Sequence, residues 1–89
     1  MHYLYVLQSL ESADRFYIGC TSDLRKRVKE HNSGNEQSTK GMKWKLVYYE
    51  AYVSFKAARK REYRLKHNGK ARRHVMDRIK ESVSDLSAG

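Results

Sequence analysis

The hydrophobic positions near the N-terminus alternate with a period of two. In residues 2–8 (HYLYVLQ), this period places Tyr5 and Leu7 on one face and Val6 on the other. Alternation with aromatic and β-branched content is typical of a strand. A second short run, residues 15–20, follows a polar stretch. We therefore expect these two strands to pair as an antiparallel hairpin.

After the hairpin, the apolar spacing changes to that of a helix. Thr21-Ser22-Asp23 offers N-cap side chains, and Asn32-Ser33-Gly34 is expected to end the helix. Residues 33–43 are polar and contain glycine, which predicts a loop. Residues 44–52 (WKLVYYEAY) predict a third strand from their aromatic and β-branched content.

Two further helices are predicted in the C-terminal part of the chain. Ser54 can cap the first, which runs to about Lys66, and Asn68-Gly69 ends it. The next helix is expected over about 70–82, with a frayed tail over 83–89. The chain is therefore expected to form one domain, residues 1–82. Its fold class is α/β (α+β), a small three-stranded antiparallel sheet flanked by helices in the order β-β-α-β-α-α.

Charge and composition narrow the function classes. The 89 residues contain 19 Lys and Arg against 10 Asp and Glu, a formal net charge of +9. So basic a chain is expected to attract polyanions, above all nucleic acid, although a solubilising surface is the alternative. No apolar stretch is long enough to span a membrane, and no signal peptide is evident. One cysteine permits no internal disulfide, so we expect a cytoplasmic protein.

The first predicted helix has polar side chains on its apolar face. Leu24, Arg27, Val28 and His31 share one stripe, with Arg27 and His31 four residues apart. A guanidinium held by packing can grip a phosphate through two hydrogen bonds. Alternatively, Arg27 reaches outward to solvent and His31 interacts with the C-terminal end of its helix.

The second helix places a carboxylate on its apolar stripe. Phe55, Ala58, Glu62 and Leu65 fall on one face, and basic side chains cover most of the remainder. An unpaired buried carboxylate is costly, so Glu62 needs a cation. The cation can be a divalent metal ion, which takes oxygen ligands, or an arginine in a purely structural pair.

Tyrosines crowd the predicted hairpin, and other familiar catalytic patterns are absent. Tyr17 and Gly19 share a face of the second strand, where a glycine leaves room for another backbone or a ligand to approach. Ordinary strand packing is the alternative for these tyrosines. The sequence has no glycine-rich phosphate loop, no zinc spacing and no Ser-His-Asp candidate. Cys20 has no apparent partner base, so we expect a structural residue.

Taken together, four segments resemble the GIY-YIG nuclease domain. They are Tyr3-Leu4-Tyr5, Tyr17-Ile18-Gly19, residues 21–32 (TSDLRKRVKEHN), and Glu62 within AARKREYRLK. The first motif lacks the glycine and isoleucine of the family pattern. The chain is most similar to small stand-alone proteins that resemble the N-terminal nuclease domain found in the excinuclease ABC system.

The resemblance implies a metal-dependent endonuclease. Its catalytic residues would be Tyr5, Tyr17, Arg27, His31 and Glu62, and Glu62 would hold a single Mg²⁺ or Mn²⁺ ion. Arg27 would bind the scissile phosphate, and one tyrosine, in the family pattern Tyr5, would take a proton from the attacking water. The implied substrate is DNA and the implied setting DNA repair, without a membrane.

The remaining basic residues are expected to follow the nucleic-acid backbone. Residues 56–80 alone hold eleven Lys and Arg, which read no base sequence by themselves, so we expect little sequence specificity. The candidate nucleic-acid contacts are Arg25, Lys26, Lys29, Lys40, Arg59, Arg61 and Lys66. No appended DNA-binding domain is present in this sequence, so a partner protein is a candidate for targeting. The alternative function is a non-catalytic nucleic-acid-binding module with the same fold.

Overall fold

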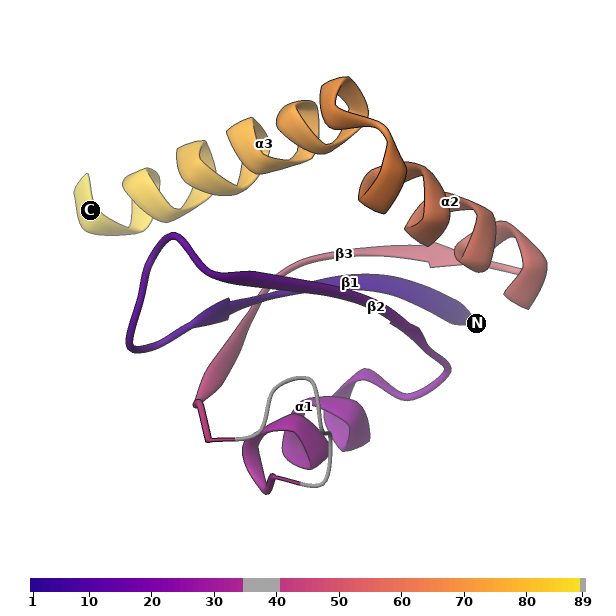
Figure 1. The fold of residues 1–89 in the computed structure, drawn as a ribbon, viewed down its shortest axis with the longest axis horizontal. Coiled ribbons are helices and arrows are strands. Elements are labelled where there is room, and N and C mark those ends of the chain that lie inside the picture. Colours follow the sequence, from indigo (N-terminus) through magenta and orange to yellow (C-terminus); the bar gives the residue numbers. More distant parts are fainter. Residues whose placement is uncertain (35–40, 89) are drawn as a thin grey trace.

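The elements follow the predicted order (Figure 1). The computed structural model describes residues 1–34 and 41–88. Its elements are β1 (His2–Ser9), β2 (Phe16–Thr21), α1 (Leu24–Asn32), β3 (Trp44–Tyr52), α2 (Phe55–His67) and α3 (Gly69–Ala88). The α+β class and the antiparallel hairpin are confirmed. Of the predicted loop, residues 35–40 lie outside the described part of the chain.

The sheet has the strand order β2-β1-β3, and both pairings are antiparallel. The central strand, β1, therefore bonds to a neighbour on each side. Its residues Leu4 to Leu7 are at most 1% exposed. Tyr5 lies opposite Gly19 of β2 and Tyr49 of β3. A register shift between Val6 and Leu7 marks an irregularity in the pairing with β3.

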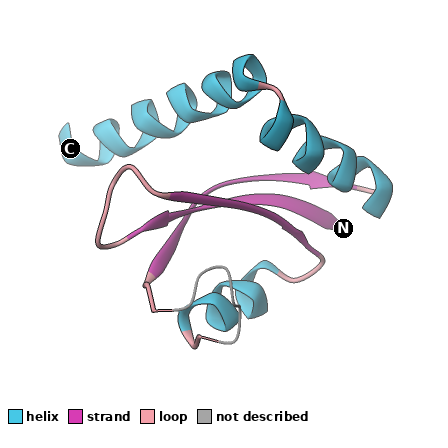
Figure 2. Cartoon of the chain, in the orientation of Figure 1, coloured by secondary structure: helices cyan, strands magenta, loops and turns pink. Residues whose placement is uncertain are grey.

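Helices cover both faces of the sheet, and Figure 2 shows α1 on one side with α2 and α3 on the other. Because side chains alternate along β1, Val6 packs with Leu65 of α2 and with Val75 and Ile79 of α3. Burial of such apolar side chains supplies most of the driving force for folding.

The second cluster lies on the α1 side of the sheet. It contains Tyr5, Leu7 and Trp44, with Leu24 and Val28 of α1 packed against it. The stripe expected on the first helix therefore does face the sheet. The alternating pattern of β1 thus carries two cores, one on each face, and Tyr5 belongs to the α1 side.

Local capping chemistry explains most helix boundaries. The Asp23 side chain accepts a hydrogen bond from the Lys26 amide at the start of α1, and the Ser54 side chain accepts one from Ala57 at the start of α2. Both are N-caps, as the sequence predicts. Asn68 ends α2, and its side-chain oxygen accepts from the Ala71 amide in the first turn of α3.

Two details differ from the sequence-based expectations. The third helix continues to Ala88 instead of ending near residue 82, because no glycine or proline interrupts the chain before that point. Phe55, expected on the core stripe of α2, is 56% exposed. It occupies the first turn of α2 and packs edge-on against His2, with the Arg59 guanidinium above its ring.

Within the described residues, no helix is both long enough and apolar enough to cross a membrane.

Candidate active site

The Tyr5 hydroxyl joins the sheet to α1. Its oxygen lies 2.8 Å from Nε2 of His31, and it accepts a hydrogen bond from Nε of Arg27 at 3.3 Å. Tyr5 is 1% exposed and His31 is fully buried. Arg27 and His31, four residues apart on α1, therefore meet at one phenol oxygen. Two buried polar groups satisfy each other here, and a guanidinium stabilises negative charge on that oxygen.

Gly19 makes room for this hydroxyl. A Cβ atom built on Gly19 would lie 2.5 Å from the Tyr5 oxygen and 2.7 Å from the ring carbon that carries it. No side chain larger than hydrogen fits there unless Tyr5 moves. The sequence predicts room for another backbone or a ligand beside Gly19, whereas in the structure the Tyr5 side chain fills this space.

Tyr17 extends the aromatic cluster toward α2. Its ring centroid lies 4.7 Å from that of His31 and 6.3 Å from that of Tyr5. The Nζ of Lys66 lies 5.9 Å from the centroid of the Tyr17 ring. Tyr17 is partly exposed, whereas Tyr5 is enclosed. Of the two tyrosines, Tyr17 is the one that solvent reaches more readily.

The Arg27 guanidinium borders an open hollow. Its Nη1 atom lies 3.4 Å from Oε1 of Glu30. The Arg27 side chain is 30% exposed and the Glu30 side chain 35% exposed. The hollow is lined by Cys20, Thr21, Ser22, Asp23, Lys26, Arg27 and Glu30. A partly exposed ion pair of this length contributes little, so an anion that enters the hollow can replace Glu30.

Glu62 lies on α2 between two cations. Its Oε2 accepts a hydrogen bond from Lys66 at 3.0 Å, and its Oε1 lies 3.6 Å from Arg59. The Glu62 side chain is 14% exposed, and those of Lys66 and Arg59 are 44% and 61% exposed. The expectation of a partly buried, charge-paired carboxylate agrees with this geometry. Lys66, which contacts both Glu62 and Tyr17, links this carboxylate to the aromatic cluster.

Cys20 lies between the two parts of the site. It lines the Arg27 hollow, and its thiol donates to the carbonyl oxygen of Ala58 on α2 at 3.2 Å. Burial first, and then the nearby charge of Glu62, raises the pKa of Cys20 to about 12. The thiol is therefore protonated at neutral pH, which agrees with the expectation of a structural rather than a nucleophilic cysteine.

The donor set at Glu62 fits a loosely held hard cation. Within residues 1–34 and 41–88, no group of three or more His, Cys, Asp or Glu side chains could hold a metal ion. Mg²⁺ nevertheless often binds through a single carboxylate, with water and a substrate phosphate as its other ligands. The side chains of Arg59 and Lys66, which pair with Glu62, are exposed to solvent and can move away. A divalent ion is therefore compatible with Glu62 when a phosphate accompanies it.

The expected nucleic-acid contacts do not all lie on one surface. Lys26 lines the Arg27 hollow, and Arg59 and Lys66 flank Glu62. Arg25 and Lys29 instead border a separate hollow on the other side of α1, together with Leu46. Arg61 is paired with a carboxylate of β3. Lys40 lies outside the described residues and stays a prediction.

A partly buried polar network around Glu50 was missed in the sequence. Glu50 of β3 accepts two hydrogen bonds from Arg61, at 2.8 and 3.0 Å, and one each from the hydroxyls of Tyr48 and Tyr52. Burial alone would raise the pKa of Glu50, but the hydrogen bonds from Arg61 and the two tyrosines outweigh it and lower the pKa to about 2. The period-two spacing of Tyr48, Glu50 and Tyr52 was the available signal.

Comparisons with known proteins identify a matching family model and similar relatives. The family model described as the GIY-YIG catalytic domain matches residues 1–75. A UPF0213 protein of Clostridium perfringens is 38% identical over 68 residues, which cover 74% of this chain and 71% of the relative. A UPF0213 protein of Halobacterium salinarum is 33% identical over 78 residues, which cover 85% of this chain and 99% of the relative.

A solved structure is also similar. The solution NMR structure of a UPF0213 protein from Bacillus halodurans is 32% identical, with a TM-score of 0.47. The match covers 99% of this chain and 86% of that protein.

Proposed function

The chain belongs to the GIY-YIG catalytic-domain family, and from this premise we propose that it is a metal-dependent endonuclease that hydrolyses phosphodiester bonds of DNA with little sequence specificity. Members of this domain family are typically nucleases, and their substrate is nucleic acid. The observation that carries the proposal is the convergence of Tyr5, His31 and Arg27 at one hydroxyl, joined through Tyr17 and Lys66 to Glu62.

Arg27 is proposed to bind the scissile phosphate. It borders the open hollow, and its ion pair with Glu30 is long and partly accessible to solvent. A phosphate that replaces Glu30 brings the reacting group next to the Tyr5 hydroxyl, which Arg27 already contacts. The guanidinium then stabilises the negative charge that develops on the phosphate oxygens in the transition state.

Tyr5 is proposed as the general base, with His31 as its partner. The Tyr5 oxygen takes the proton of the attacking water as its own proton passes to Nε2 of His31, 2.8 Å away, which later gives it up again. Tyr17, packed against His31 and partly exposed, orients the water or the phosphate through its own hydroxyl. Gly19 keeps the space in which the Tyr5 hydroxyl has this position.

Glu62 is proposed to hold the divalent ion, Mg²⁺ or Mn²⁺. When bound, such an ion would supply positive charge to the leaving oxygen and to the phosphate. Lys66 and Arg59, now paired with Glu62, would be released to contact the nucleic-acid backbone.

A second candidate is the non-catalytic nucleic-acid-binding module. The observation in its favour is that both carboxylate oxygens of Glu62 already face cations of the same helix. In this alternative, Glu62 only positions Lys66 and Arg59. Such a protein would bind nucleic acid equally well with and without a divalent metal and would not cut it.

A cleavage assay with a matched pair of variants separates the two functions. Duplex, branched and single-stranded DNA are incubated with Mg²⁺, Mn²⁺ or EDTA. We expect cutting only with metal, and a loss of about 100-fold or more in Glu62→Gln, which removes the charge and keeps the size. Glu81→Gln, an exposed acid on α3, is the control and is expected to cut like the unaltered protein.

Absence of cutting with every metal, while DNA binding persists, would favour the binding module. Full activity of Glu62→Gln would show that this carboxylate does not hold the metal. Circular dichroism of both variants establishes that each is folded.

A further inference from the structure

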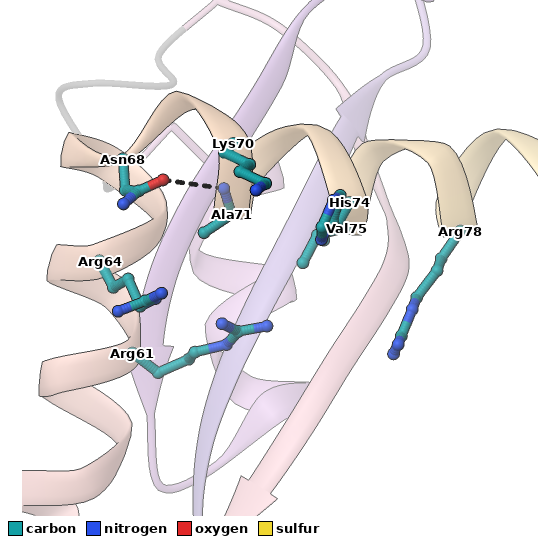
Figure 3. A pocket seen from close by; sticks show the side chains of 8 residues that line it. All are labelled: Arg61, Arg64, Asn68, Lys70, Ala71, His74, Val75 and Arg78. Carbon is teal, nitrogen blue, oxygen red and sulfur yellow. Dashed lines mark hydrogen bonds between the residues drawn. The ribbon is translucent and has the colours of Figure 1, made fainter.

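A basic hollow lies between α2 and α3, apart from the Glu62 site. Figure 3 shows it from close by: Arg61 and Arg64 extend from α2, and Lys70, His74 and Arg78 from α3. Asn68 lies at the junction of the two helices. Within the described part of the chain, no acidic side chain lines this hollow.

Most cations here have no structural role that would explain their clustering. Arg61 is neutralised by Glu50, and nearby Arg72 donates to the carbonyl oxygens of Leu65 and Lys66. For Arg64, Lys70 and Arg78, in contrast, no ion pair is found within residues 1–34 and 41–88. Like charges around one concavity repel each other, and an anion that binds among them relieves this repulsion.

The position of the hollow relative to Glu62 indicates which anion it takes. Arg61 and Glu62 are consecutive on α2 but point to different sides of the helix, toward Glu50 and toward Lys66 respectively. The exposed surface between them carries Lys60 and Arg64. A strand that passes Glu62 can therefore cross α2 over basic side chains and reach the hollow.

We propose that the hollow between α2 and α3, built on Arg64, Lys70 and Arg78, is a second phosphate-binding site that holds the nucleic-acid backbone away from the cleavage site. The nature of the anion rests on the proposed function. The site contacts backbone phosphate and no base, so it adds affinity and orientation without sequence specificity.

The test compares two double variants that remove equal charge from the same helix. Lys70→Gln with Arg78→Gln removes two cations that line the hollow. Arg73→Gln with Lys80→Gln removes two exposed cations that do not line it. Binding is measured by fluorescence anisotropy in EDTA, with a DNA duplex of about 20 base pairs. At ~3.4 Å per base pair, this duplex exceeds the 36 Å longest extent of the protein.

We expect the hollow variant to bind about tenfold more weakly than the unaltered protein at physiological salt. The slope of log affinity against log salt should become shallower by about 1.8, the value for two lost phosphate contacts. In the control variant, the loss of affinity and the change of salt slope should each be less than half of those in the hollow variant. Equal losses in both pairs would overturn the proposal, because general surface charge would then explain them.

The presence of EDTA and one further readout keep the second site distinct from the proposed function. Because the assay contains EDTA, failure of metal-dependent cleavage does not affect it, whereas absence of any DNA binding by the unaltered protein would contradict the proposed function itself. Two-dimensional NMR with the duplex should shift the amides of Lys70, His74 and Arg78. If inorganic phosphate shifts them and the duplex does not, the hollow is a small-anion site and the assignment to nucleic acid is wrong.

Discussion

At the scale of single residues, the hydroxyl of Tyr5 determines the geometry of the candidate site. It contacts His31 and Arg27 of α1 and lies directly above Gly19 of β2. Each of these contacts depends on the absence of a side chain at position 19. The glycine therefore acts through space rather than through backbone freedom.

A methyl group at Gly19 is expected to displace Tyr5. In Gly19→Ala, the new Cβ would meet the Tyr5 ring at 2.5 to 3.0 Å, so the hydroxyl must move away from His31 and Arg27. We expect a loss of about 1–3 kcal/mol in the free energy of unfolding and a large fall in cleavage rate. Urea denaturation and the cleavage assay measure the two effects.

Gly69→Ala is the matched control, because a Cβ there meets only the end of the Arg72 side chain at 3.9 Å. It should cost no stability. If Gly19→Ala behaves like this control, the close packing of Tyr5 on β2 is not essential.

At the scale of elements, Glu50 ties β3 to α2. Tyr48 and Tyr52 donate to it from the same strand, and Arg61 donates from α2 with two nitrogens. Because the Glu50 side chain is 17% exposed, its charge is stabilised mainly by these donors. The network fixes how α2 lies on the sheet, and α2 carries Glu62 on its other side.

This network predicts a stability that depends on pH. The pKa of Glu50 is about 2 in the folded protein, against 4.5 for a free carboxyl. A lowered pKa stabilises the fold fully above about pH 4.5, and this contribution is lost as the pH falls toward about 2. We expect it to be about 2 kcal/mol after solvent screening is allowed for.

Urea denaturation of the unaltered protein and of Glu50→Gln across this pH window measures the effect. Glu50→Gln should be less stable near neutral pH and should lose less stability on acidification. Glu81→Gln should keep the acid dependence of the unaltered protein. An unchanged acid dependence in Glu50→Gln would show that other carboxylates are responsible.

At the scale of the whole molecule, the two faces of the sheet have different tasks. The α1 face carries Tyr5, Tyr17, Arg27 and His31, whereas the face under α2 and α3 contains the larger apolar cluster. Glu62 on α2 is linked through Lys66 to the candidate site around Tyr17. We therefore expect the nuclease-like domain, predicted as residues 1–82, to need α3 for its core rather than for the proposed cleavage step.

Truncation of α3 tests this division. Val75 and Ile79 are each 1% exposed, and Val83 is only partly buried. A chain that ends after Val83 should lose less than ~1 kcal/mol of stability. A chain that ends after His74 loses both buried side chains, ~1.5–3 kcal/mol each, and should be largely unfolded. Thermal unfolding followed by circular dichroism compares the two chains. Equal stability would show that Val75 and Ile79 are not essential to the core.

Local patterns were sufficient to predict the secondary structure, apart from the end of α3, and to select candidate site residues. The period of two in β1, the cap residues Asp23 and Ser54, and the break at Asn68 depend on side chains a few residues apart, so the sequence alone predicts them. The same holds for the unusual polar positions Arg27, His31 and Glu62, which stand out against an apolar period. The resemblance to the GIY-YIG family rested on such short segments and is confirmed.

Contacts between distant segments were decided only by the tertiary structure. Twenty-six positions separate Tyr5 from His31, and eleven separate Glu50 from Arg61. No periodicity specifies which polar side chains will meet across such separations. The sequence therefore determined which residues are candidates, whereas the packing of α1 and α2 on opposite faces of the sheet decided their partners: Arg27 reaches Tyr5, and Arg61 is held by Glu50.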